Sequence, residues 1–422
     1  MRLRLRDTTA LAAGSLVSGV LAYVFFALAT RHLGPDDAAA VSVLWTYWSF
    51  AAAVLTFPIQ HWIARSVAAH GGEGAVRAAM PRVAGLVVAA ALVSALLAFA
   101  GRDPLFHRDD VWFPLLVAWV TVGSGFIGVV RGSLAARHRF VSSAWALVAE
   151  NGSRCVAAGA LVLAGLYSNV AFGACLAAGA MVGLLWPSTL RFGREQPRGE
   201  VESPFAFLSG AAGGQLIGQA VLTGGPVVLA LSGGTPAEVT ALFAALALFR
   251  APYTLGIGLV SQITGRLAGL VSRGNHAALR KVRLILLGFA AVAVAVASLV
   301  GGLIGPWLIA LVFGAAVEVS TPVALIVAVG SALALSNLVV TIAILAQNRT
   351  HAVARGWTIA LVGAAVTFAA CLALAPLERT CWAFLAAEAV AFVVLLLEES
   401  RGLRKIELAH AGQAGRAGSA AG

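Results

Sequence analysis

Long apolar runs, separated by short polar stretches, repeat along the whole chain. A membrane hydrocarbon core of about 30 Å takes roughly 20 apolar residues in helical form, and the runs reach that length. We expect spans at residues 8–30, 39–60, 81–101, 111–130, 142–165, 168–190, 204–231, 237–260, 283–304, 320–346, 352–375 and 381–398. The pattern predicts an all-α membrane protein with about twelve transmembrane helices.

Two stretches need separate interpretation. The segment 305–320 is interrupted by Pro306 and Glu318, so we expect it to lie at the interface and not to form a span. The first apolar run is longer than the 7–15 residues of a signal-peptide core. We therefore expect it to remain as the first span.

Composition agrees with a lipid environment. Of 422 residues, 60% are hydrophobic and only 11% are charged, whereas soluble domains are about 25% charged. The four cysteines lack metal-ligand spacing, and no catalytic motif or nucleotide-binding loop is present. The net charge of +11 forms no continuous basic stripe of the nucleic-acid-binding kind. We predict no enzyme activity, no catalytic or metal site, no cofactor and no nucleic-acid partner.

The distribution of basic residues predicts the topology. With the spans above, and with Arg82 and Arg283 at span ends counted with the adjoining loops, 23 of the 29 arginines and lysines fall on the side that holds the N-terminus. Four fall on the other side, and Arg154 and Arg250 fall deep inside spans. Cytoplasmic loops carry the excess of arginine and lysine. An even number of spans with both termini in the cytoplasm is therefore expected.

This topology is testable with reporter fusions. A reporter fused after Gly199 should read as cytoplasmic, and one fused after Asp110 should read as external, because the basic residues alternate with the spans. A periplasmic signal at Gly199 would overturn the span count.

The polar stretch from Arg191 to Ser203 divides the chain into equal halves. We expect an N-terminal six-helix lobe at 1–200, a C-terminal six-helix lobe at 201–400 and a disordered cytoplasmic tail at 401–422. Equal halves of this kind are common in transporters.

Charged residues inside spans are costly and mark candidate functional positions. Glu150 and Arg154, four residues apart in span 142–165, lie on one helix face, where they can pair, and Asn151 lies beside them. One interpretation is a structural ion pair that neutralises itself. The other is a polar face of a water-filled cavity that presents the arginine to an anionic substrate.

The second half holds further candidates. Arg250 lies near the middle of span 237–260, and Pro252 frees a backbone carbonyl beside it. This combination favours a broken helix that lines a cavity. Asn337 and Glu388 are polar candidates in later spans; the sequence leaves open whether Glu388 binds a coupling proton or pairs with Arg250.

Span 204–231 combines small and polar residues. Gly210, Gly214 and Gly218 form a ridge that permits close helix approach, and Gln215 and Gln219 form an adjacent polar strip. Close packing and a cavity-facing role both remain open for this helix.

Four stretches carry motifs similar to those of a known family: 31–37 (RHLGPDD), 131–140 (RGSLAARHRF), the central loop from 262–266 (QITGR) through 273–281 (RGNHAALRK), and 311–314 (LVFG). In this order they resemble the Wzx-type polysaccharide flippases. These belong to the MOP exporter superfamily, with the MATE drug exporters and the lipid II flippases.

This resemblance implies two six-helix lobes around a central cavity and a lipid-linked oligosaccharide flipped across the bacterial inner membrane by alternating access. The substrate's pyrophosphate would suit Arg154 and Arg250, because guanidinium groups match phosphate oxygens. Expected partners are the lipid-linked glycan, membrane lipids and polysaccharide-assembly proteins. Coupling to H⁺ or Na⁺ is left open, because span 204–231 lacks the acidic residue found near 223–225 in many relatives.

Two other functions are considered. A MATE-like ion-coupled exporter of small molecules would show a net acidic lumen, whereas the two arginines here balance Glu150 and Glu388. An integral-membrane glycosyltransferase or polymerase would need a substantial outer loop with catalytic groups. The candidate loop at 101–110 is too short for an acceptor site.

Overall fold

The computed structural model describes residues 5–70, 72–193, 195, 216–257, 276–347 and 349–419. Regular structure in these ranges is helical throughout, and eight helical stretches within them are long and apolar enough to cross a membrane. The all-α membrane prediction is thus confirmed. The count of twelve spans stays a prediction, because the expected spans 204–231 and 237–260 extend beyond the described residues.

The first of these stretches, Thr9–Ala69, contains two helical arms. Its helix α1 (Leu5–Ala51) breaks at Gly34, whose φ of 77° and ψ of 171° are not helical. The rings of Phe25 and Trp45 lie 5.5 Å apart between centroids. In a straight helix, these residues would be separated by about 30 Å. The chain therefore folds back at the Gly34-Pro35 turn, and the arms correspond to the expected spans 8–30 and 39–60.

The second arm contains a π-helical turn, η1 (Ala52–Thr56), just before α2 (Phe57–His70). Pro58 has no N–H to donate to the carbonyl of Val54, so regular α-helical bonding is interrupted there. The Thr56 hydroxyl donates to the carbonyl of Ser124 at 2.8 Å. On the facing helix α5 (Trp112–Ala136), a Cβ added at Gly128 would lie 3.0 Å from Thr56. Glycine thus allows the two backbones to approach closely.

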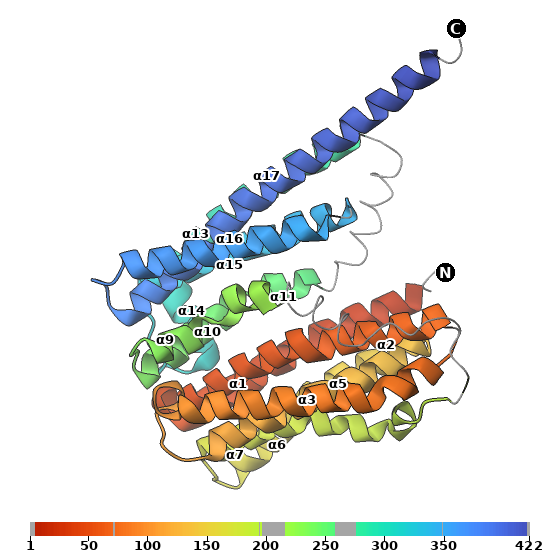
Figure 1. The fold of residues 1–422 in the computed structure, drawn as a ribbon. Coiled ribbons are helices and arrows are strands. Elements are labelled where there is room, and N and C mark those ends of the chain that lie inside the picture. Colours follow the sequence, from red (N-terminus) through yellow and green to blue (C-terminus); the bar gives the residue numbers. More distant parts are fainter. Residues whose placement is uncertain are drawn as a thin grey trace. The chain divides into compact units, whose positions relative to one another are not determined.

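Helix contacts divide the chain into two compact units, residues 1–244 with 307–319, and residues 245–306 with 320–422. In the first unit, α1 packs on α6 (Phe140–Leu163), while α2 and α3 (Gly74–Ala100) pack on α5 (Figure 1). Its shorter elements are α4 (Arg102–Phe106), α7 (Asn169–Ala178), η2 (Gly179–Leu185), η3 (Pro187–Leu190), α9 (Gly225–Leu231), most of α10 (Pro236–Phe249) and most of α14 (Gly305–Phe313).

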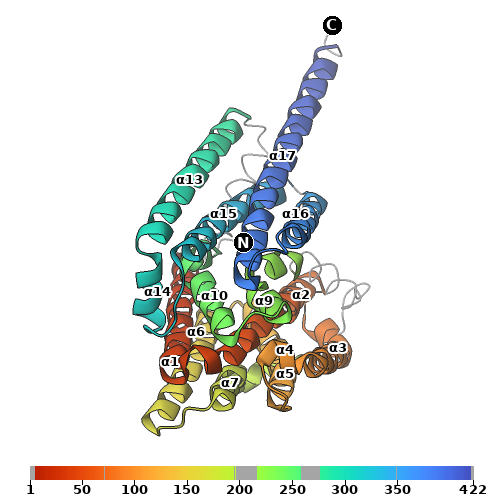
Figure 2. The same cartoon turned by 90° about the vertical axis from the view of Figure 1, so that its left-hand side faces the viewer.

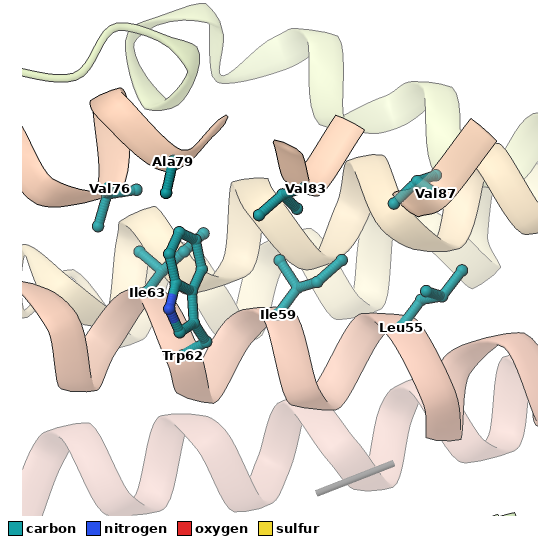
Figure 3. Packing of buried hydrophobic residues seen from close by; sticks show 8 residues of the cluster. All are labelled: Leu55, Ile59, Trp62, Ile63, Val76, Ala79, Val83 and Val87. Carbon is teal, nitrogen blue, oxygen red and sulfur yellow. The ribbon is translucent and has the colours of Figure 1, made fainter. Parts of the chain in front are cut away.

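An apolar cluster joins α2 and η1 to α3 in this unit. Leu55, Ile59, Trp62 and Ile63 face Val76, Ala79, Val83 and Val87 (Figure 3). Each of these side chains is buried, and burying a side chain of valine or leucine size stabilises a protein in water by about 1.5–3 kcal/mol. In a membrane, where lipid tails are equally apolar, close packing holds such a cluster together.

In the second unit, α17 (Pro376–Ser419) packs against both α15 (Thr321–Ala346) and α16 (Thr350–Ala370) (Figure 2). Helix α13 (His276–Leu303) packs against α15, as does α11 (Ala251–Ile257). Helix α15 begins after Ser320, with Pro322 in its first turn, a position where the missing proline N–H has no helical partner to lose.

The expected lobes at 1–200 and 201–400 and the expected disorder of the tail 401–422 stay predictions. Helix α17 continues to Ser419. The compact units meet after Ala244, and the segment 307–319 joins the first unit.

Candidate functional site

The ion pair expected in α6 is formed and buried. Arg154 Nη2 lies 2.7 Å from Glu150 Oε1, and the two residues are 1% and 2% exposed. Arg154 Nη1 donates to Asn151 Oδ1 at 2.7 Å. Three neighbouring residues of one helix face thus form a polar cluster within the first unit.

Other helices complete the surroundings of Arg154. Its Nε donates to the carbonyl of Leu176 in α7 at 3.0 Å, and its guanidinium lies 4.5 Å from the ring centroid of Trp48 and 5.9 Å from that of Trp45. Such cation–π contacts stabilise a desolvated arginine. A Cβ at Gly179 would lie 2.3 Å from Arg154 Nε, so only glycine leaves room for the arginine there.

Asn151 ties this cluster to α1. Its amide nitrogen donates to the hydroxyl and the carbonyl of Ser18, at 2.7 and 3.2 Å. The Cys155 thiol also contacts the carbonyl of Leu21 at 3.0 Å. This geometry is compatible with a buried pair that neutralises itself, the first of the two interpretations above. A role of Arg154 in substrate binding stays a prediction.

Arg250 lies at the break between α10 and α11. Its Nε donates to the carbonyl of Leu246 at 2.8 Å, and its own carbonyl accepts the N–H of Thr254 at 3.0 Å. Pro252 in the first turn of α11 is compatible with a new helix start. The two helices are thus separated by Arg250 alone, and a cavity-lining role of this helix stays a prediction.

Glu388 and Asn337 form a second polar cluster, in the second unit. The Asn337 amide donates to Glu388 Oε2 at 2.8 Å and to the Glu388 carbonyl at 2.9 Å, and both residues are fully buried. Arg250 and Tyr253 interact electrostatically with Glu388. The structure thus brings Arg250, Asn337 and Glu388 into one neighbourhood.

Two oxygens of this cluster, Asn337 Oδ1 and Glu388 Oε1, accept no hydrogen bond from the described residues. A buried acceptor without a donor costs about 1–3 kcal/mol. A proton on Glu388 or a donor from a ligand would remove that cost. This cluster is therefore the better candidate for a group that changes its protonation or its hydrogen-bond partners.

The glutamine candidates have different outcomes. Gln219 donates from Nε2 to the Thr223 hydroxyl at 3.1 Å, and that hydroxyl donates to the Gln219 carbonyl at 2.9 Å. These bonds are local to one helical turn that ends before Gly224. Gln215 lies outside the described residues.

Sequence reasoning missed the aromatic partners of Arg154. Trp45 and Trp48 lie one turn apart in the second arm of α1. That three-residue spacing places them on one face of the helix. Two tryptophans on one helix face could have indicated a cation–π site. Nothing in the sequence indicated that their partner is an arginine about 100 positions away.

Two of the motifs singled out above contact one another. Arg31, before the Gly34 turn, donates from Nε to the carbonyl of Val312 at 3.2 Å and from Nη2 to that of Leu311. Thr30 donates to the carbonyl of Phe313 at 2.6 Å. These donors cap the C-terminus of α14, where free carbonyls attract cations. The contact joins segments about 280 residues apart.

Residues 4–256 match the model of a family described as polysaccharide biosynthesis protein. A comparison with curated proteins finds none that matches the sequence.

The fold is similar to that of an inward-facing multidrug resistance MATE family transporter of the MOP superfamily, at 15% identity over 92% of this chain and 95% of that one, with a TM-score of 0.71. It is also similar to the lipid II flippase MurJ in an inward closed conformation, at 12% identity over 94% and 90% with a TM-score of 0.66. A MOP superfamily transporter from Pyrococcus furiosus matches at 15% identity over 95% and 96%, with a TM-score of 0.62. These likenesses show a shared fold.

Proposed function

The chain belongs to the family of polysaccharide biosynthesis proteins, and from this membership we propose that it flips a lipid-linked oligosaccharide or polysaccharide precursor across the bacterial inner membrane. The similarity of fold to a transporter of the MOP superfamily supports a transporter and not an enzyme. The match over residues 4–256 is the observation that carries the proposal.

The position of Arg250 supports a transported anion. A lipid-linked glycan carries a diphosphate, and Arg250 is a cation at the break of a transmembrane helix, beside a cluster with unsatisfied buried oxygens. An arginine at membrane depth is costly unless it meets water, a ligand or an acid. In the proposed cycle, Arg250 binds the diphosphate while Glu388 and Asn337 supply an adjustable polar environment. Alternating access between two lobes, with both termini in the cytoplasm, is part of the proposal.

Reconstitution tests the function directly. In proteoliposomes, the protein should transfer a polyprenyl-diphosphate oligosaccharide between leaflets, measured as the fraction accessible to a glycan-cleaving enzyme added outside. Liposomes without protein are the control. The proposal fails if accessibility matches the control while the protein transports small organic cations in an ion-dependent way.

That second outcome would favour a MATE-like exporter, the alternative suggested by the similarity to the multidrug transporter. The buried Glu388 could then serve as an ion-coupling carboxylate. The clusters of the described residues are not predominantly acidic, since Arg154 accompanies Glu150 and Arg250 interacts with Glu388. A lipid-linked anion therefore fits the described residues better.

A further inference from the structure

A groove runs between α3 and α5 in the first unit, outside the polar clusters. Its apolar part has a volume of about 370 Å³ and is lined by Val83, Val87 and Val88 from α3 and by Val122, Phe126 and Val129 from α5. Val83 and Val87 also belong to the buried cluster of Figure 3. The floor of the groove is therefore a packed surface, while Val88 and Val122 on its rim are exposed.

The same groove has a basic end. A hollow of about 560 Å³ is lined by Arg77, Pro81 and Arg191, and it shares Met80, Ala84, Leu190 and Phe192 with the apolar part. The two hollows are thus parts of one groove, which we call the α3–α5 groove. Both arginines are exposed, and no acidic residue lines either part among the described residues.

A polar network holds the segment that carries Arg191 and Phe192. Glu73, just before α3, binds Arg137 through both carboxylate oxygens at 2.6 and 3.0 Å, and it accepts the N–H of Gly193 at 2.9 Å. Arg137 also donates to the carbonyls of Ser188 and Arg191 at 2.8 and 2.7 Å. The Arg137 hydrogen bond holds the pKa of the Glu73 carboxyl below its usual range. The basic end is therefore built into the fold.

The groove lies within the depth of one leaflet. With the expected span at 81–101, Arg77 lies outside the hydrocarbon core, and Val88 lies seven positions into the span, about 10 Å along the helix axis. Half of a hydrocarbon core of about 30 Å is about 15 Å. The groove thus places a basic end outside the hydrocarbon core and an apolar part inside one leaflet, as the headgroup and acyl chain of a phospholipid require.

We propose that the α3–α5 groove is a binding site for an anionic glycerophospholipid of the surrounding membrane. Arg77 and Arg191 bind the phosphodiester, since guanidinium groups pair with phosphate oxygens in two-point contacts. One acyl chain lies in the apolar part. Because the groove does not extend beyond one leaflet, it fits the acyl chain of this lipid better than a much longer polyprenyl chain. The proposed site is independent of the proposed function.

Native mass spectrometry of the purified full chain, with added phosphatidylglycerol or phosphatidylcholine, tests the site. The wild type should retain one phosphatidylglycerol in preference to phosphatidylcholine. The double variant Arg77→Gln/Arg191→Gln should bind phosphatidylglycerol about tenfold more weakly, whereas Arg82→Gln should not. Arg82 is a matched control, because it is an exposed arginine of α3 that does not line the groove.

A second pair of variants tests the apolar part. Ala84→Phe fills the groove where its two parts meet and should weaken retention of both lipids. Ala89→Phe, at an exposed alanine of the same helix outside the groove, should leave retention unchanged. Elution as a single species confirms that each variant is folded. Equal retention of phosphatidylglycerol by the wild type and the arginine double variant overturns the proposal, as does equal retention of phosphatidylglycerol and phosphatidylcholine by the wild type.

Discussion

Replacing Arg154 by methionine is expected to lower the free energy of unfolding by about 3–5 kcal/mol, because it leaves the buried Glu150 carboxylate without its partner. The loss includes the hydrogen bonds from Arg154 to Asn151 and to the carbonyl of Leu176. Chemical unfolding in detergent micelles, together with immunoblots of membrane levels, measures the effect.

The double replacement Glu150→Leu/Arg154→Met should recover most of that stability, because removing both charges of a buried pair is often neutral. Arg139→Met is the control. Arg139 is exposed at the N-cap of the same helix, and surface changes usually stay within about 0.5 kcal/mol. A stable Arg154→Met protein would contradict the structural ion pair. A stable double variant without transport would instead assign the pair to the transport cycle.

Replacing Arg250 by glutamine is expected to reduce transport about 10- to 100-fold at an unchanged protein level. A hydrogen bond to a charged group contributes about 1.5–3 kcal/mol, and the proposed diphosphate contact is of this kind. Arg250→Lys should retain part of the activity, because it keeps the charge and loses the planar two-point contact. Complementation of a flippase-deficient strain, with membrane immunoblots, gives transport and protein level together.

The electrostatic interaction of Arg250 with Glu388 offers an alternative role for Arg250, with a different expected result. If Arg250 only neutralises this carboxylate, Arg250→Gln should lower the protein level, and Arg250→Gln/Glu388→Gln should restore level and transport together. Arg404→Gln, at an exposed position of the same unit, is the control for loss of one positive charge. Full transport by Arg250→Gln at a normal level would rule out substrate binding by this residue.

Sequence alone predicted the features that depend on local chemistry. Helices α3, α5, α6, α13, α15, α16 and α17 cover the apolar runs expected to form spans. Their agreement follows from the need to satisfy every backbone hydrogen bond within the segment when lipid is the solvent. The pairing of Glu150 with Arg154 was also predictable, because a helix brings side chains four positions apart onto one face.

The tertiary structure alone decided which distant residues meet. Trp48 contacts Arg154, and Arg137 binds Glu73. The sequence around each of these residues does not indicate which distant residue it contacts. The segment 307–319 belongs to the first unit, because Thr30 and Arg31 cap the C-terminus of α14. The length and position of apolar runs in the sequence predict where membrane-spanning helices form. Among apolar helices in lipid, close packing and hydrogen bonds between helices select the neighbours, and these depend on side-chain shapes from separate parts of the chain.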